Sequence, residues 1–359
     1  MMILLLLIAL TAIAIVAFLH TAPTFGASPS GRSIVKIEQS EQFKNGKFVN
    51  SVETKIDTRR AGESMDLTTY VFPADGKNPS SPLPSVEFDP ENFNSGDFVW
   101  FGHSSILFRS GELTVITDPV FHRASPVPVM GKPFPLSSTL NVHVLPKIDI
   151  VLISHDHYDH LDHKSIMQLK ERVKLFLVPL GVRSHLLRWG VPDANIIELD
   201  WYDSHTISNT VCTLTPTRHY SGRGFTNRNS TLWGSWVVKN KEASIFYSGD
   251  SGYFDGFKSI GDLFGPFDIT FMENGAYDEQ WSQVHMQPEE SVQAAIDLNS
   301  KLYFPIHWGK FDLAKHQWKE PIRRAVQIAN EKNIPIASPR IGEVFRLDSI
   351  PNENWWESS

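Results

Sequence analysis

The sequence predicts an α/β fold that follows an apolar N-terminal helix, and three observations favour this prediction. Short β-rich runs alternate with stretches of helical spacing along most of the 359 residues. Several β-rich runs end at His or Asp residues, and an α/β sheet usually carries its chemistry at the carboxyl ends of its strands. Residues Met1 to Leu19 are uncharged and, except for Thr11, apolar.

The N-terminal apolar run is long enough to cross a membrane. Nineteen residues at a rise of 1.5 Å form about 28 Å of helix, close to the hydrocarbon thickness of a bilayer. No basic residue precedes the run and Phe25 makes a poor cleavage site, so we expect residues 1–25 to form an uncleaved transmembrane anchor, with a cleaved signal segment as the alternative. The basic residues after it favour a cytoplasmic body, with export left open: Arg32, Lys36, Lys44 and Lys47.

The next stretch, residues 26–95, is polar and turn-rich. Pro79, Pro82, Pro84 and Pro90 predict an extension that wraps the core and has little regular structure. Residues 96–347 carry the alternating strands and helices of one core domain, and residues 348–359 form a C-terminal tail.

Within this domain, a first meander of strands is predicted over residues 98–101, 105–108 and 113–117. The run 148–153 predicts a further strand, and residues 161–172 show helical spacing before strand character returns at 175–179. Gln287-Pro288-Glu289-Glu290 predicts another helix start, with Pro in the first turn and acids at the positive end of the helix dipole.

Four metal-binding side chains directly follow the strand predicted over 148–153. His155, His157, Asp159 and His160 have the spacing H-x-H-x-D-H. Neutral imidazole and carboxylate suit zinc, and adjacent Asp159 and His160 point differently from the two preceding His residues, which favours two ions over one. The alternative is a His-rich surface loop.

Three further candidates lie at the ends of other β-rich runs. His219 follows residues 210–218, Asp250 follows 243–249, and His307 follows 302–306. With Asp118 after residues 113–117, the order Asp, H-x-H-x-D-H, His, Asp, His resembles the ordered signature of the metallo-β-lactamase superfamily.

The resemblance implies a four-layer αββα sandwich and two Zn²⁺ per chain. It assigns His155, His157 and His219 to one ion, Asp159, His160 and His307 to the other, and Asp250 to a bridge between them. It also implies that Asp118 accepts a hydrogen bond that fixes the orientation of a ligand. Taken alone, Asp118 before Pro119 also suits a turn.

A narrower resemblance, to the branch of N-acylphosphatidylethanolamine-hydrolysing phospholipases D, covers roughly residues 40–347. It is carried by residues 154–161, 198–201, 233–236, 249–253, 264–268, 275–277 and 306–309. Two features depart from the branch: Phe271-Met272-Glu273-Asn274 is more polar than expected, and the N-terminus differs from that of the animal enzyme.

The branch implies hydrolysis of a membrane phospholipid. A water shared by two ions about 3.5–4 Å apart loses a proton near neutral pH and attacks phosphorus. The products are phosphatidic acid and an N-acylethanolamine. Asp159, Asp250 and His285 are the expected catalytic residues, with His285 near the phosphate or the leaving group; a surface His beside a helix is its alternative.

Other residues are weaker candidates for the substrate pocket. Tyr158, Tyr277, Trp236 and Trp308 are expected to line it, although Trp residues beside strands more often belong to the core. His103 is expected to be structural, because the metal sites are already filled. Cys212 lies in a β-rich run and is expected to be a buried thiol.

Composition narrows the function further. The net charge of −7 includes no polybasic tract, so nucleic acid is not expected as a partner; the oligomeric state is left open. One alternative function is hydrolysis of a lactone or a soluble phosphodiester, because the ions polarise carbonyl and phosphoryl oxygens alike. Iron-dependent redox chemistry is disfavoured by His157, where that branch carries Glu. A membrane-anchored metal-binding scaffold without catalysis is the alternative from another class.

Overall fold

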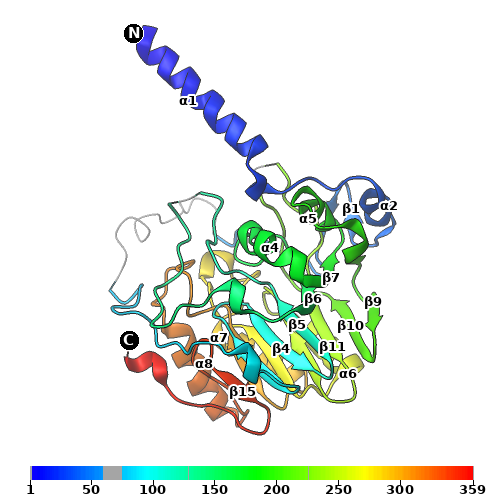
Figure 1. The fold of residues 1–359 in the computed structure, drawn as a ribbon, viewed down its shortest axis with the longest axis vertical. Coiled ribbons are helices and arrows are strands. Elements are labelled where there is room, and N and C mark those ends of the chain that lie inside the picture. The colour runs from blue at the N-terminus through cyan, green and yellow to red at the C-terminus, as the bar shows by residue number, and fades with distance from the viewer. Residues whose placement is uncertain (1, 60–74, 128, 225, 359) are drawn as a thin grey trace.

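The computed structural model describes residues 2–59, 75–127, 129–224 and 226–358 (Figure 1). Its helices are α1 (Met2–Thr21), α2 (Arg32–Gln39), α4 (His163–Leu169), α5 (Arg183–Arg188), α6 (Gly256–Phe264), α7 (Pro288–Asp297) and α8 (Glu320–Glu331). Its strands are β1 (Phe43–Lys44), β2 (Lys47–Phe48), β3 (Asp97–Trp100), β4 (Ile106–Ser110), β5 (Leu113–Thr117), β6 (Ile148–Leu152), β7 (Val173–Pro179), β8 (Ile196–Leu199), β9 (Ser204–Ile207), β10 (Thr210–Thr215), β11 (Ser235–Lys239), β12 (Ser244–Tyr247), β13 (Ile269–Glu273), β14 (Tyr303–Ile306) and β15 (Val344–Arg346).

Two mixed sheets form the centre of the fold. The first has seven strands in the order β15-β3-β4-β5-β6-β7-β8, and the second has six in the order β14-β13-β12-β11-β10-β9. Both sheets begin as antiparallel meanders and change to parallel pairing, at β5–β6 in the first sheet and at β12–β13 in the second.

Three apolar clusters hold these sheets in four layers. The largest lies between the sheets and joins Phe98 and Leu152 to Trp236 and Phe271. A second packs α4 and α5 on the outer face of the seven-stranded sheet, and a third packs α6, α7 and α8 on the outer face of the other. Because both faces are covered, the central strands are almost continuously apolar. The αββα sandwich is confirmed.

Strand direction brings the carboxyl ends of seven strands to one edge of the sandwich. β3 and β5 are both antiparallel to β4, and β5 is parallel to β6, so all three run the same way. In the other sheet, β10 and β12 are both antiparallel to β11, and β13 and β14 are parallel to β12. β10, β12, β13 and β14 therefore run in the same direction. The loops that follow these strands therefore meet across the interface between the sheets.

The N-terminal part begins with α1, which projects from the body as one straight helix (Figure 1). It has the length and composition to cross a membrane, as a signal sequence also would, so the anchor remains a prediction. Within residues 26–95, the regular elements among the described residues are α2, the β1–β2 hairpin and a 3-10 turn at Pro90–Asn92, so the wrapping extension with little regular structure stays a prediction; residues 60–74 lie outside the described part. Beyond residue 348, the expected tail buries Trp355 and Trp356 in the core.

Candidate metal centre

The seven predicted ligands converge at this shared edge. Four of them follow β6, and His219, Asp250 and His307 follow β10, β12 and β14. His155, His160, His219, Asp250 and His307 are buried, whereas His157 and Asp159 are partly exposed. The side chains form two clusters that share Asp250.

The first cluster contains three imidazoles and one carboxylate oxygen. His157 Nδ1 lies 2.8 Å from His155 Nε2 and 3.2 Å from His219 Nε2. Asp250 Oδ2 lies 3.8 Å from His155 Nε2 and 3.7 Å from His219 Nε2. All four atoms fall within 4.8 Å of one another.

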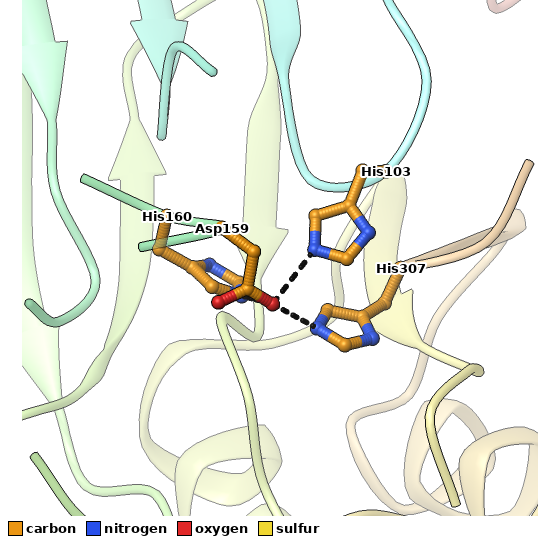
Figure 2. Close-up of side chains that lie close together, drawn as sticks. All are labelled: His103, Asp159, His160 and His307. Carbon is orange, nitrogen blue, oxygen red and sulfur yellow. Dashed lines mark hydrogen bonds and ion pairs between the residues drawn. The ribbon is translucent and has the colours of Figure 1, made fainter. Parts of the chain in front are cut away.

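The second cluster uses the other oxygen of Asp250. Asp250 Oδ1 lies 3.0 Å from His160 Nε2 and 3.1 Å from His307 Nε2. Asp159 Oδ2 lies 3.6 Å from His160 Nε2 and 3.4 Å from His307 Nε2, and Figure 2 shows these side chains turned toward one another. Asp250 is therefore placed between the two clusters, with one oxygen facing each.

The donor atoms fit divalent metal ions in chemistry and spacing. Four ligands at about 2.0–2.2 Å from a tetrahedral zinc ion lie about 3.3–3.6 Å from one another, and the distances in both clusters bracket this range. His160 Nε2, His307 Nε2 and Asp250 Oδ1 are buried and lack a hydrogen-bond partner among the described residues. Buried polar atoms are normally satisfied, so three orphaned atoms that face one point indicate a cation site.

Neighbouring groups orient three of the imidazoles. His160 Nδ1 donates to Asp118 Oδ2 at 2.7 Å, and His219 Nδ1 donates to the Val284 carbonyl at 2.9 Å. His155 Nδ1 lies 2.9 Å from Ser154 Oγ, which itself donates to Asp118. A proton on each Nδ1 leaves Nε2 unprotonated, so the lone pair of Nε2 faces the cluster and can bind a metal ion. Asp118 thus makes the contact expected of it from the sequence.

Electrostatics distinguish the two clusters. Burial lowers the pKa of His155 and of His219 well below the usual value, so these imidazoles are neutral ligands. Burial also opposes the charge on His307, but the carboxylates of Asp250 and Asp159 outweigh it and raise the pKa of His307 to about 10. Positive charge is therefore stabilised between Asp159 and Asp250.

His103 belongs to this centre, although the sequence favoured a structural role. Its Nε2 lies 3.1 Å from Asp159 Oδ2, and its ring centre lies 4.0 Å from that of His307 (Figure 2). Its backbone is in the left-handed region, with φ of 56°, and it pairs with the β14 loop: His307 N donates to the His103 carbonyl at 3.0 Å. His103 therefore holds Asp159 through its Nε2 and contacts the ring of His307.

His285 reaches the centre from the loop before α7. Its ring centre lies 5.1 Å from that of His219 and 5.5 Å from that of His307. Its Nδ1 is 2.5 Å from Oε1 of Glu273, the fully buried last residue of β13. Burial raises the pKa of Glu273, and His285 opposes this rise. Glu273, which sequence reasoning did not single out, fixes the orientation of His285.

A cavity of about 500 Å³ opens over both clusters. His157, Asp159, Asp250, His285 and His307 form its floor. Its walls are mostly apolar and aromatic and include Ile56, Tyr158, Tyr220, Trp281, Val284 and Leu313.

Three residues expected in this cavity lie elsewhere, which corrects the prediction. Trp236 is buried between the sheets and donates to the Ile153 carbonyl, because its register on β11 points it inward. Trp308 stacks on Trp355 in the core. Tyr277 turns away to donate to Glu320 Oε1 at 2.9 Å.

Comparisons with known proteins agree with this fold. The family described as "Beta-lactamase superfamily domain" matches residues 114–308. An uncharacterized protein of Mycobacterium tuberculosis is 38% identical over 352 residues, which cover 94% of this chain and 93% of that protein. The N-acyl-phosphatidylethanolamine-hydrolyzing phospholipase D 1 of Caenorhabditis elegans is 32% identical over 264 residues, which cover 69% of this chain and 74% of the worm protein.

Among solved structures, Igni18, a metallo hydrolase from the hyperthermophilic archaeon Ignicoccus hospitalis, matches with a TM-score of 0.53. The match covers 69% of this chain and 97% of the archaeal chain at 19% identity, and it shows a shared fold.

Proposed function

Because the chain belongs to the metallo-β-lactamase superfamily and is a metal-dependent hydrolase of that fold, we propose that it is a binuclear zinc phosphodiesterase acting on N-acylphosphatidylethanolamine-like phospholipids. The reaction adds water to phosphorus and breaks the bond to the N-acylethanolamine oxygen, so the products are phosphatidic acid and an N-acylethanolamine.

The position of Asp250 carries this proposal. One carboxylate whose two oxygens face two separate His clusters is the arrangement expected of a group that bridges two ions. When bound, two divalent ions supply a nucleophile at neutral pH and offset the charge that develops on the phosphoryl oxygens. Asp159 and Asp250 hold this positive charge at the cavity floor.

His285 is placed to manage the proton of the leaving group. Its Nδ1–H donates to Glu273, so Nε2 is the nitrogen available toward the cavity that His285 lines. A proton carried on Nε2 can pass to the N-acylethanolamine oxygen as its bond to phosphorus breaks. Glu273 stabilises the charged imidazole before this transfer.

The cavity walls support a lipid as the substrate. Ile56, Val284 and Leu313 offer apolar surface for an acyl chain, and the Arg228 guanidinium, 5.5 Å from the Tyr220 ring centre, offers a cation for the phosphate. The named activity of the worm relative, with the apolar helix α1, agrees with a phospholipid at a membrane.

Product analysis tests the proposal. Purified full-length protein should convert N-acylphosphatidylethanolamine to phosphatidic acid and N-acylethanolamine, and His157→Ala should lose a bound ion and turnover. His143→Ala, which changes an exposed His outside the cavity, should keep both. Full turnover with two ions in His157→Ala would overturn the assignment of the clusters.

The substrate class is tested by a parallel assay with a lactone and a soluble phosphodiester. If the lactone or the soluble phosphodiester were turned over faster than the lipid, that compound would represent the substrate class instead of the lipid. A protein that holds two ions and is inert toward all three would be a metal-binding scaffold.

A further inference from the structure

A closed loop between β5 and β6 displays apolar side chains to solvent. Val127, Val129 and Met130 are 37%, 84% and 61% exposed. Two backbone hydrogen bonds join described residues on either side of the tip: Ala124 N donates to the Gly131 carbonyl at 2.9 Å, and Met130 N donates to the Val127 carbonyl at 3.1 Å. An apolar tip on a loop held in shape indicates a surface that meets an apolar partner.

The loop that carries this tip borders the segment that follows α1. Thr24, three residues after the end of α1, lines a cavity of about 440 Å³ together with Arg123, Pro126 and Lys132 of the loop. Figure 1 shows the chain after β5 rising on the side of the body from which α1 leaves. A membrane that contains α1 would therefore lie against this loop.

The base of α1 is attached firmly to the body. Trp189 Nε1 donates to the Pro23 carbonyl at 2.7 Å, and Arg223 Nη2 donates to the Thr24 carbonyl at 2.7 Å. The Phe25 ring meets the Tyr158 ring edge-on at 6.4 Å. These contacts fix residues 23–25, which directly follow α1, to the body of the protein.

The cavity beside the loop is positively charged. Arg123, Lys132, Lys164 and Arg223 line it, and Asp162 is its one acidic residue among those described. Asp162 accepts hydrogen bonds from Lys164 N and Ser165 at the start of α4 and is occupied there. Neither Lys132 nor Lys164 has an ion-pair partner among the residues that the structure describes.

Arg223 adds a buried positive charge to the lining of this cavity. It is 2% exposed, and its hydrogen bonds go to backbone carbonyls, those of Thr24, Asp156, His157 and Leu161. No carboxylate in the described part of the chain lies within ion-pair distance of its guanidinium. The guanidinium also lies over the Tyr158 ring, 4.2 Å from its centre, and without an ion-pair contact it adds positive potential at the cavity wall.

We propose that this loop is a second membrane contact, with Val127, Val129 and Met130 inserted into the bilayer interface beside α1 and an anionic phospholipid headgroup bound in the cavity lined by Arg123, Lys132 and Lys164. Apolar loop tips flanked by cations match the interface, where acyl chains lie directly beneath charged phosphates.

The contact of this loop with the bilayer also determines where the opening of the catalytic cavity lies relative to the lipid surface. Ala124 lines the catalytic cavity, Ser125 lines the basic cavity, and Tyr158 lines both, so the loop forms their common wall. A loop resting on the bilayer therefore holds the opening of the catalytic cavity at the lipid surface. The inference shares with the proposed function only the premise of a membrane-bound enzyme.

Insertion can be measured with a single fluorescent label. Cys212 is fully buried and burial raises its pKa to about 12, so a thiol-reactive dye will label Val129→Cys selectively. In nanodiscs that hold the full-length chain, we expect blue-shifted emission and at least twofold quenching by lipids brominated on their acyl chains. The same dye at Lys332→Cys, at the far end of α8, should be quenched only by aqueous iodide.

The headgroup site is tested by charge. Nanodiscs of phosphatidylcholine with added phosphatidic acid should increase the quenching of the Val129→Cys label over phosphatidylcholine alone. Lys132→Gln with Lys164→Gln should lower the affinity for phosphatidic acid about tenfold or more, because each surface cation contributes to binding an anionic leaflet. The matched pair Lys241→Gln with Lys332→Gln, two exposed lysines outside the cavity, should not.

Three results would overturn the inference. The first is a Val129→Cys label that is quenched by iodide and not by brominated lipid, and the second is an equal affinity of the two Gln pairs for phosphatidic acid. The third is displacement of the lipid by millimolar inorganic phosphate, which would mark the cavity as a site for the free ion. None of these readouts requires turnover. Insertion without lipid hydrolysis would therefore refute the proposed function alone, and hydrolysis without insertion would refute this inference alone.

Discussion

Asp118→Asn isolates the contribution of a residue that lies outside the two ligand clusters and contacts the ligand His160. Asp118 is fully buried and its oxygens accept four hydrogen bonds: 2.7 Å from Ser154 N, 2.5 Å from Ser154 Oγ, 2.7 Å from His160 Nδ1 and 2.5 Å from Tyr247 OH. Three of these four bonds converge on Oδ2. An amide can keep the single bond at Oδ1, but its NH₂ then faces three donors.

The expected losses follow from that geometry. Breaking a buried, charged hydrogen-bond network destabilises a protein by about 3–5 kcal/mol, so the metal-free variant should unfold at lower urea. Removing the partner of a ligating His weakens metal binding about 10–100-fold, which equals about 1.4–2.7 kcal/mol. The ion near His160 should be lost first, because Asp118 contacts His160 directly and reaches His155 only through Ser154.

Zinc titration against a chelator, with metal content after dialysis, provides the assay. The control is Asp149→Asn on β6, whose carboxylate accepts Thr114 N at 2.9 Å and pairs with exposed Lys174 away from the centre. This variant should lose less than about 1 kcal/mol and keep both ions. An Asp118→Asn protein that binds two ions as tightly as the parent would refute the reasoning.

Three further predictions concern the buried groups around the centre. Glu273→Gln should lower kcat about tenfold to a hundredfold while metal content and KM stay unchanged, because Oε1 pairs with His285 whereas Oε2 accepts from Ser251 N and Met286 N, two bonds that the Gln carbonyl oxygen can keep; loss of metal would point instead to a structural role. His103→Ala should lower the affinity for the ion beside Asp159 about tenfold and leave the affinity for the other ion unchanged. The metal content of dialysed protein measures this, and equal loss of both ions would contradict it. Burial lowers the pKa of Lys310 to about 7, and the unfolded chain keeps this proton until about pH 10.4, so native stability should rise with pH by about 1.4 kcal/mol per unit between these values. The free energy of unfolding of Lys310→Met, measured in urea across this pH window, should lack that slope. If the pH profiles of the variant and the parent were parallel, Lys310 would be charged in the native state.

The ligands were predictable because each one ends a recognisable strand. His219, Asp250 and His307 follow β10, β12 and β14, and because these strands run in the same direction within one sheet, their ends meet at one edge. The apolar helix α1 was equally visible, because a run of this length without a charge is read directly from composition.

Residues whose role depends on side-chain direction were not predictable in this way. Trp236 and Trp308 stand beside motif residues, but register and loop geometry turn them into the core. His103 lies far from the cluster in sequence, and only the pairing of its loop with that of His307 brings it to Asp159.

Glu273 left a signal that could have been used. A lone acid at the end of the buried run Ile269–Glu273 requires a partner, and His285 is the nearest His that follows it in the chain.

Anomalous X-ray scattering from crystals of the zinc-loaded protein tests the central claim most directly. The account predicts two peaks about 3.5–4 Å apart, one among His155, His157 and His219 and the other among Asp159, His160 and His307, with the Asp250 carboxylate between them. A single peak at full zinc occupancy, or two peaks that do not share Asp250, would contradict it.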